Sequence, residues 1–161
     1  MVNVIHGAVG ALLGQHLESS PLAFLVGFLS HFVLDSIPHG DRDSMLKWRH
    51  HGKIDSHWWV MGIDFILTVV FVAIAFSLDV FANPYAAAYG FVGAIIPDTL
   101  IGISELCQLL GVKSRIFRRF YALHFWFHNI LLRRNIDFSV LKGLFFQGAV
   151  LIVVLVVTFW K

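Results

Sequence analysis

The stretch GFLSHFVLDSIPHGD, residues 27–41, places ionisable side chains in a segment that is otherwise apolar enough to lie in a lipid bilayer. His31, Asp35 and His39 follow one another at intervals of four residues. Residues four apart share one face of a helix, so His31 and Asp35 can bind the same object. Because an ionisable group in hydrocarbon is costly, such a pair indicates a functional site. The pair therefore predicts a site that binds a metal ion.

The composition of the whole chain also indicates a membrane protein. Hydrophobic residues make up 58% of the 161 residues and charged residues 14%, and the mean hydropathy is +0.77. We expect one integral-membrane domain over residues 1–161. Residues 2–17 lack the features of a signal peptide, so we expect them in the mature protein. The single Cys107 excludes an intramolecular disulfide, and a net charge of +2 does not favour nucleic acid as a partner.

Apolar segments predict an all-α, polytopic helical bundle. A membrane-spanning helix needs about 20 apolar residues. About five transmembrane helices are expected, over residues 2–17, 21–38, 58–78, 84–110 and 143–160. Residues 120–132 are too short to cross, which predicts an interfacial or re-entrant helix. Gly10 and Gly14 give the first segment a small-residue face for close helix packing.

The positions of the basic residues predict the orientation in the membrane. With the N-terminus in the cytoplasm, eleven of the twelve lysines and arginines fall on the cytoplasmic side, and Lys161 alone falls outside. Basic residues accumulate in short cytoplasmic loops, so we expect a cytoplasmic N-terminus in a cell (inner) membrane.

This topology brings His and Asp side chains from several segments into one layer near the cytoplasmic face. The candidate metal ligands are His6, His31, His39, His124 and His128, with Asp35, Asp64 and Asp98. Asp64 and Asp98 are also candidates for a catalytic base. Mixed His and Asp donors favour zinc, with manganese or iron as alternatives, and eight candidates are enough for two ions. A two-metal site activates water and binds both reacting oxygens of a phosphate or acyl centre.

The residues also resemble a known family. His6-Gly7-Ala8-Val9-Gly10, the Leu-Ser-His-x-x-x-Asp unit at residues 29–35 and the Pro97-Asp98 unit are similar to motifs of the integral-membrane, metal-dependent hydrolase-like proteins, the YdjM type also described as LexA-binding inner-membrane hydrolases. The resemblance implies a helical membrane fold and a metal-dependent hydrolase. His51 with His57, or His124 with His128, are the alternatives for the remaining histidine unit of the family. A more distant similarity to zinc-dependent phospholipase C and P1 nuclease implies phosphoester chemistry.

Each candidate ligand has a structural alternative. His6 can make an interhelical hydrogen bond, and His39 follows Pro38 and can lie at the interface outside the helix. Asp64 and Asp98 can form ion pairs or relay protons. His124 and His128 can face the headgroups on an interfacial helix.

We expect a hydrolase that acts on a phosphoester or acyl substrate near the inner leaflet, with Arg118 and Arg119 binding a substrate phosphate. The partners would be the lipid bilayer and a small-molecule or lipid substrate. A divalent-metal or proton transporter built on the same His and Asp residues is the alternative function. A third interpretation is a scaffold in which the metal only holds helices together.

Overall fold

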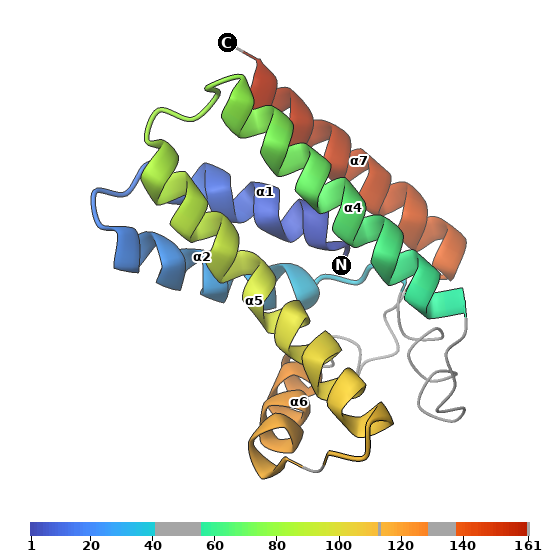
Figure 1. Ribbon diagram of the computed structural model, residues 1–161. Helices are drawn as coiled ribbons and strands as arrows, with labels where there is room; N and C mark the ends of the chain where they lie inside the picture. The colour runs from blue at the N-terminus through green and yellow to red at the C-terminus, as the bar shows by residue number, and fades with distance from the viewer. Residues whose placement is uncertain (41–55, 113, 129–137, 161) are drawn as a thin grey trace.

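The computed structural model describes residues 1–40, 56–112, 114–128 and 138–160, and within them the chain forms six α-helices and no strand. The all-helical fold predicted from the sequence is confirmed. The helices are α1 (Asn3–Gly14), α2 (Ser20–Asp35), α4 (Ser56–Ser77), α5 (Pro84–Leu109), α6 (Arg115–His128) and α7 (Val140–Phe159) (Figure 1).

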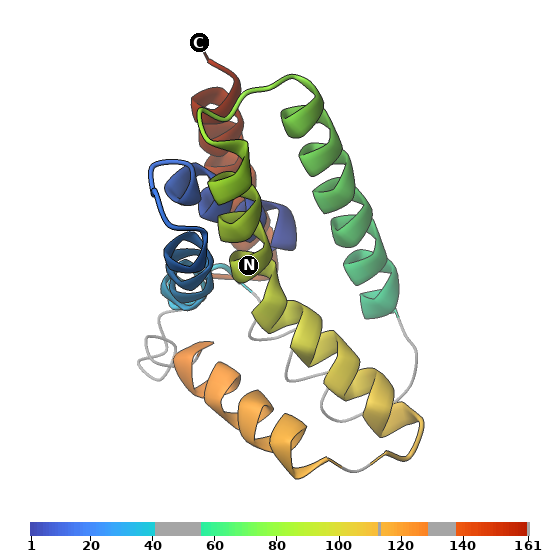
Figure 2. The ribbon, with the colours of Figure 1, turned by 60° about the vertical axis from the view of Figure 1, so that its left-hand side comes forward.

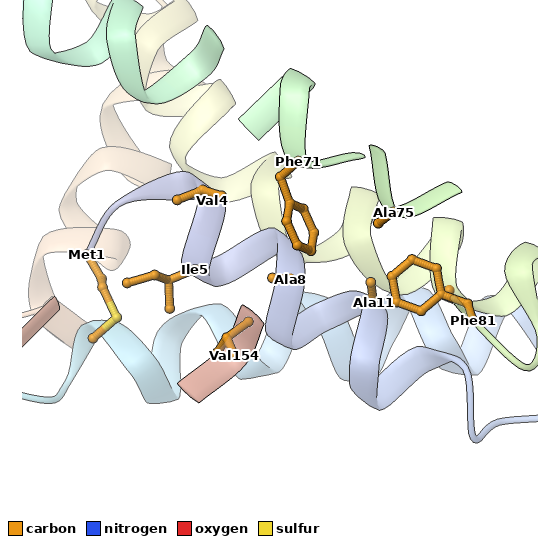
Figure 3. Close-up of a cluster of buried hydrophobic side chains, with 10 residues drawn as sticks. Met1, Val4, Ile5, Ala8, Ala11, Phe71, Ala75, Phe81 and Val154 are labelled. Atoms are coloured by element: carbon orange, nitrogen blue, oxygen red, sulfur yellow. The ribbon is translucent and has the colours of Figure 1, made fainter. Parts of the chain in front are cut away.

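Helix α1 lies at the centre of the fold. It packs against α2, α4, α5 and α7, and Figure 1 shows it surrounded by these longer helices. Five of its 12 residues are glycine or alanine, which lets neighbouring helices approach it closely. The hydrophobic core is built on α1 and is shown in Figure 3. The residues labelled there include Ile5, Ala8, Ala11, Phe71, Ala75, Phe81 and Val154.

Glycines set the close contact among α1, α2 and α5. A Cβ atom on Gly10 or on Gly27 would overlap the backbone carbonyl oxygen of Gly90. A Cβ atom on Gly14 would come within 2.5 Å of the Ala86 carbonyl oxygen. The predicted small-residue face of Gly10 and Gly14 is therefore confirmed, and it packs on α5. These contacts fix the positions of the helices that carry the candidate ligands.

Helix α5 extends past the end of α1 and supports α6. The helix begins where Asn83 accepts a hydrogen bond from the Ala86 amide at 3.2 Å, with Pro84 in the first turn. Figure 2 shows α6 beside the C-terminal half of α5, running back toward the C-terminal end of α2. This return brings residues of α6 next to the end of α2.

Two of the described helices are long and apolar enough to cross a membrane. The spans are Pro84–Gln108 in α5 and Leu141–Phe159 in α7. The sequence predicted about five membrane-spanning helices, and the described residues do not reach this number. Helices α1 and α2 have 12 and 16 residues, fewer than the roughly 20 that a bilayer requires. Helix α1 ends at Gly14, and α2 ends at Asp35, shortly before Pro38. The described apolar part of α4 is Met61–Ser77.

The short helix predicted over residues 120–132 is present as α6, but it begins earlier, at Arg115, and is described to His128. Its sequence, RIFRRFYALHFWFH, alternates basic residues with apolar ones and so gives the helix two different faces. Such a helix suits a membrane surface better than the membrane interior.

Candidate metal centre

Four candidate ligands predicted from the sequence converge on one point. One side-chain atom from each of His31, Asp35, Asp98 and His124 lies within 4.8 Å of the atoms from the other three. Helix α2 supplies His31 and Asp35, one turn apart on the same face. Helix α5 supplies Asp98, and α6 supplies His124. We call these four residues the central cluster.

The distances within the central cluster match those between the ligands of a tetrahedral metal ion. His31 Nε2 lies 3.0 Å from Asp35 Oδ2 and 3.5 Å from Asp98 Oδ1. His124 Nε2 lies 3.6 Å from each of the same two oxygens. Nitrogen and oxygen ligands at ~2.0–2.1 Å from a tetrahedral zinc are about 3.3–3.4 Å apart. Four of the six distances among these atoms are close to this value, and the other two are at most 4.8 Å, so the four atoms could hold a divalent ion.

The ring of His31 is oriented with its lone pair toward the cluster. His31 Nδ1 lies 2.8 Å from the Ala94 carbonyl oxygen. A carbonyl oxygen only accepts, so Nδ1 carries the proton and Nε2 of a neutral ring carries the lone pair. Among the described residues, this buried Nε2 makes no hydrogen bond. In a neutral ring its lone pair would face two carboxylate oxygens, and a cation between them would remove the repulsion, whereas a protonated ring would form an ion pair with Asp35 Oδ2 at 3.0 Å.

Asp35 contacts the central cluster with one oxygen and other partners with the second. Oδ2 faces His31 and His124, while Oδ1 accepts hydrogen bonds from the Met1 amino group at 2.8 Å and from His6 Nε2 at 3.0 Å. The side chain is 2% exposed. A carboxylate held in this way has a fixed orientation, as expected for a ligand supported by surrounding donors.

His6 and His39 lie next to the central cluster and not within it. His6 donates to Asp35, and its ring stacks on that of His31 with centroids 4.1 Å apart. His39 Nδ1 donates to the Ile37 carbonyl at 2.6 Å, which leaves Nε2 to accept from the Met1 amino group at 2.8 Å. Their predicted role as ligands stays a prediction, and in the present geometry both orient groups around Asp35.

Asp64 contacts the beginning of α1. Its carboxylate accepts hydrogen bonds from the Asn3 amide at 2.7 Å and from the Val4 amide at 3.4 Å. These amides belong to the first turn of α1, where backbone donors have no partner within the helix. The observed contacts are those of a helix cap supplied by α4, so the predicted catalytic or ligand role of Asp64 receives no support from its position.

The other predicted site residues fall outside the central cluster. Arg118 and Arg119 are exposed on α6. They lie six and five residues before His124, respectively, on other faces of the helix. His128 is the last residue of α6, and its side chain lies outside the described part of the structure, as do His51 and the side chain of His57. The predicted ligand roles of these three histidines therefore fall outside the described residues.

Two groups near the central cluster were not predicted from the sequence. The carbonyl group of Ala94 orients His31, and no side-chain motif indicates a backbone acceptor. Glu105 on α5 is buried at 8% exposure, and it lies seven residues after Asp98. A spacing of seven puts two residues on the same helix face, so this signal was present in the sequence.

The central cluster could hold a metal ion through two imidazole nitrogens and two carboxylate oxygens. This donor set suits zinc, manganese or iron. Asp98 is the most exposed member, at 24%, whereas the other three are between 0% and 3% exposed.

Comparisons with protein-family models, with curated proteins and with solved structures find no match for this chain.

Proposed function

We propose that this chain is a membrane-embedded, metal-dependent hydrolase whose metal centre is the central cluster. The observation that carries the proposal is the arrangement around His31 Nε2. This nitrogen lies 3.0 Å from Asp35 Oδ2 and 3.5 Å from Asp98 Oδ1, and one atom from each of the four residues lies within 4.8 Å of the others. Two imidazoles and two carboxylates gathered at one buried point are a donor set that suits a divalent metal ion.

In this proposal His31, Asp35 and His124 hold the ion, and Asp98 lies at the accessible corner. A bound divalent ion would activate water near neutral pH and polarise a phosphoryl or acyl oxygen. Asp98 would orient the attacking water and accept its proton, since a carboxylate within hydrogen-bond reach can act as a general base. Zinc is the ion that we propose, with manganese or iron as alternatives. A second ion stays a prediction, because the described residues form one such cluster.

The membrane location rests on apolar side chains that the described fold leaves uncovered. Only 22% of the spanning window of α7 is buried within the structure. Large apolar side chains are exposed along both α4 and α7, and they include Ile63, Phe65, Ile66 and Val70 on α4 and Leu144, Phe145, Ile152 and Val153 on α7. Such a continuous apolar surface is typical of contact with lipid. We propose that α4 spans the membrane together with α5 and α7, and that α1 lies among them.

The substrate that we propose is a phosphoester or acyl compound at the inner leaflet. The N-terminus would face the cytoplasm, as the distribution of basic residues predicts. Arg118 and Arg119 are exposed cationic residues on the helix that also carries His124. They could bind the phosphate of a lipid or of a small molecule at the membrane surface.

Hydrolysis assays on purified protein in lipid vesicles would test this function. Zinc-loaded protein is expected to hydrolyse members of a panel of phosphoesters, phospholipids and acyl esters, and a chelator should abolish the activity. Asp98→Asn should lower the rate about 100-fold or more, because it removes the base. Asp79→Asn is the matched control, since Asp79 lies in the α4–α5 connection at φ 54°, a conformation that Asn tolerates.

Absence of hydrolysis by metal-loaded wild-type protein across the panel would contradict the proposal. Zinc flux into the same vesicles that requires Asp98 would instead support the alternative function of a divalent-metal transporter.

A further inference from the structure

Helix α6 has two faces of different chemistry. Its buried and half-buried side chains are His124 and five aromatic residues, Phe117, Phe120, Tyr121, Phe125 and Phe127. At about 100° per residue, these six positions occupy one arc of the helix. The rings of His124 and Phe127 contact the ring of Phe32 on α2, with centroids 5.8 Å and 4.9 Å apart. This inner face therefore attaches α6 to the rest of the fold.

The outer face of α6 is exposed, and it carries both cations and large apolar side chains. Its members are Arg115, Ile116, Arg118, Arg119, Ala122, Leu123 and Trp126. They occupy the arc opposite His124. Ile116 is 78% exposed, Leu123 50% and Trp126 48%. The sequence of α6 contains no acidic residue, so the three arginines have no acidic neighbour on their own helix.

The headgroup layer of an anionic bilayer matches this combination of side chains. Arginine stems can lie along apolar surface while their guanidinium groups reach the lipid phosphates. Tryptophan is enriched at the same depth of the membrane. Anionic lipids attract basic residues near the surface, by about fivefold for each residue. A soluble phosphate compound would neutralise the arginines but would leave Ile116, Leu123 and Trp126 in water.

The outer face is directed away from the central cluster. A helix with its side chains is about 10–12 Å across, so a phosphate bound by Arg115 or Arg119 lies on the far side of α6 from His124. Figure 2 shows α6 at the edge of the fold, with α5 beside it. A lipid bound to the outer face would therefore anchor the helix that carries His124, at a distance from the central cluster.

We propose that the outer face of α6 is a docking surface for anionic phospholipids in the headgroup layer of the membrane. The three arginines bind the lipid phosphates, and the apolar side chains enter the layer between them. The inference rests on the membrane location proposed above and is independent of the metal centre. It assigns the arginines of α6 to bilayer lipid and not to a soluble phosphate.

Lipid-selective quenching of a fluorophore on the outer face tests this proposal. Ala122→Cys, combined with Cys107→Ala, gives one labelling site at an exposed position among the arginines. The full labelled chain is reconstituted in phosphatidylcholine vesicles that contain either spin-labelled phosphatidylglycerol or spin-labelled phosphatidylcholine, with the nitroxide near the headgroup. Half-maximal quenching should need a mole fraction of phosphatidylglycerol that is about fivefold lower or more, the attraction of one basic residue to an anionic surface.

Charge variants and salt identify the cause of this preference. Arg115→Gln, Arg118→Gln and Arg119→Gln combined should bring the two mole fractions to the same value. Lysine at the three positions keeps the charges and should retain most of the difference. High salt should reduce the difference in the unmutated outer face, because it screens exposed charges. A fluorophore at Ser19→Cys is the matched control without expected preference, because Ser19 is exposed beside Glu18 and makes no side-chain cap hydrogen bond.

Three results would overturn the proposal. The first is equal quenching by the two lipids at position 122, and the second is a preference that persists in the glutamine variant. The third is quenching by neither lipid, as expected if the outer face binds a protein outside the bilayer. If the glutamine variant does not fold, a preference that high salt leaves unchanged overturns the proposal instead. The measurement involves neither metal nor hydrolysis, so the failure of this inference and the failure of the proposed function are distinguishable.

Discussion

His31 Nδ1 donates a hydrogen bond to the Ala94 carbonyl oxygen over 2.8 Å, and this contact joins the middle of α5 to the last turns of α2. Ala94 lies one turn before Asp98, so the helix that orients the His31 ring also supplies a second member of the central cluster. The contact fixes which nitrogen of His31 faces Asp35 and Asp98. A backbone carbonyl therefore orients the His31 ring, and contacts of this kind are common around metal-binding histidines.

His6 is predicted to tune metal affinity through Asp35. His6→Phe keeps a ring next to His31 but removes the donor to Asp35 Oδ1, which should weaken zinc binding about 10- to 100-fold. Zinc content at saturating zinc should be unchanged. Competition with a chelator measures the affinity, and His16→Phe at the exposed end of α1 is the control. Loss of zinc even at saturation would show instead that His6 is a ligand, as the sequence analysis predicted.

Asp64 is predicted to stabilise α1 without binding metal. Asp64→Ala removes the acceptor for the Asn3 and Val4 amides and should lower the free energy of unfolding by about 1 kcal/mol, the usual effect of losing a helix cap. Denaturation in mild detergent measures the stability, and Glu18→Ala, at an exposed position between α1 and α2, serves as the control. Zinc content should not change. A zinc-free Asp64→Asn protein that remains folded would restore Asp64 as a candidate ligand.

The sequence was sufficient for the helical fold and for part of the candidate site. His31 and Asp35 were predicted from their spacing on one helix, and Asp98 from its place in an apolar segment without a cation. The distinction between His124 and His6 could not be predicted, because both are histidines on apolar helices. It depends on which oxygen of Asp35 each ring faces, since Nε2 of His6 faces Oδ1 and Nε2 of His124 faces Oδ2, and long-range contacts determine that. The number of spanning helices was overestimated because the first two segments form helices of only 12 and 16 residues, and the described apolar part of α4 begins at Met61.

Gly90 is predicted to hold the candidate ligands at their spacing. In Gly90→Ala the new Cβ would overlap the Gly10 backbone carbonyl oxygen, which cannot move aside cheaply, so α1 and α5 must separate. We expect a loss of about 1–3 kcal/mol in the free energy of unfolding and a weaker affinity for zinc. Gly148→Ala on α7 is the control, because nothing lies within 4 Å of its new Cβ. Equal stability of the two variants would contradict the close packing.

Val153 tests the contact of α7 with lipid. Its side chain is 61% exposed near the middle of the helix. Val153→Lys should impair membrane insertion, since a lysine at the centre of a span costs about 2.5–3.5 kcal/mol on insertion scales. Trp160→Lys at the helix end is the control, because a lysine there can extend to the interface. The fraction of protein that resists alkaline extraction from membranes is the measurement, and an unchanged fraction for Val153→Lys would exclude α7 as a span.

The metal content per chain tests the central claim most directly. Elemental analysis would compare detergent-purified wild type, prepared without chelator, with His31→Ala and His124→Ala. We expect about one equivalent of zinc, manganese or iron in wild type, as for one ion held by His31, Asp35 and His124, and a marked loss in both variants. Wild-type protein without metal above background would contradict the metal centre and the hydrolase proposed on it.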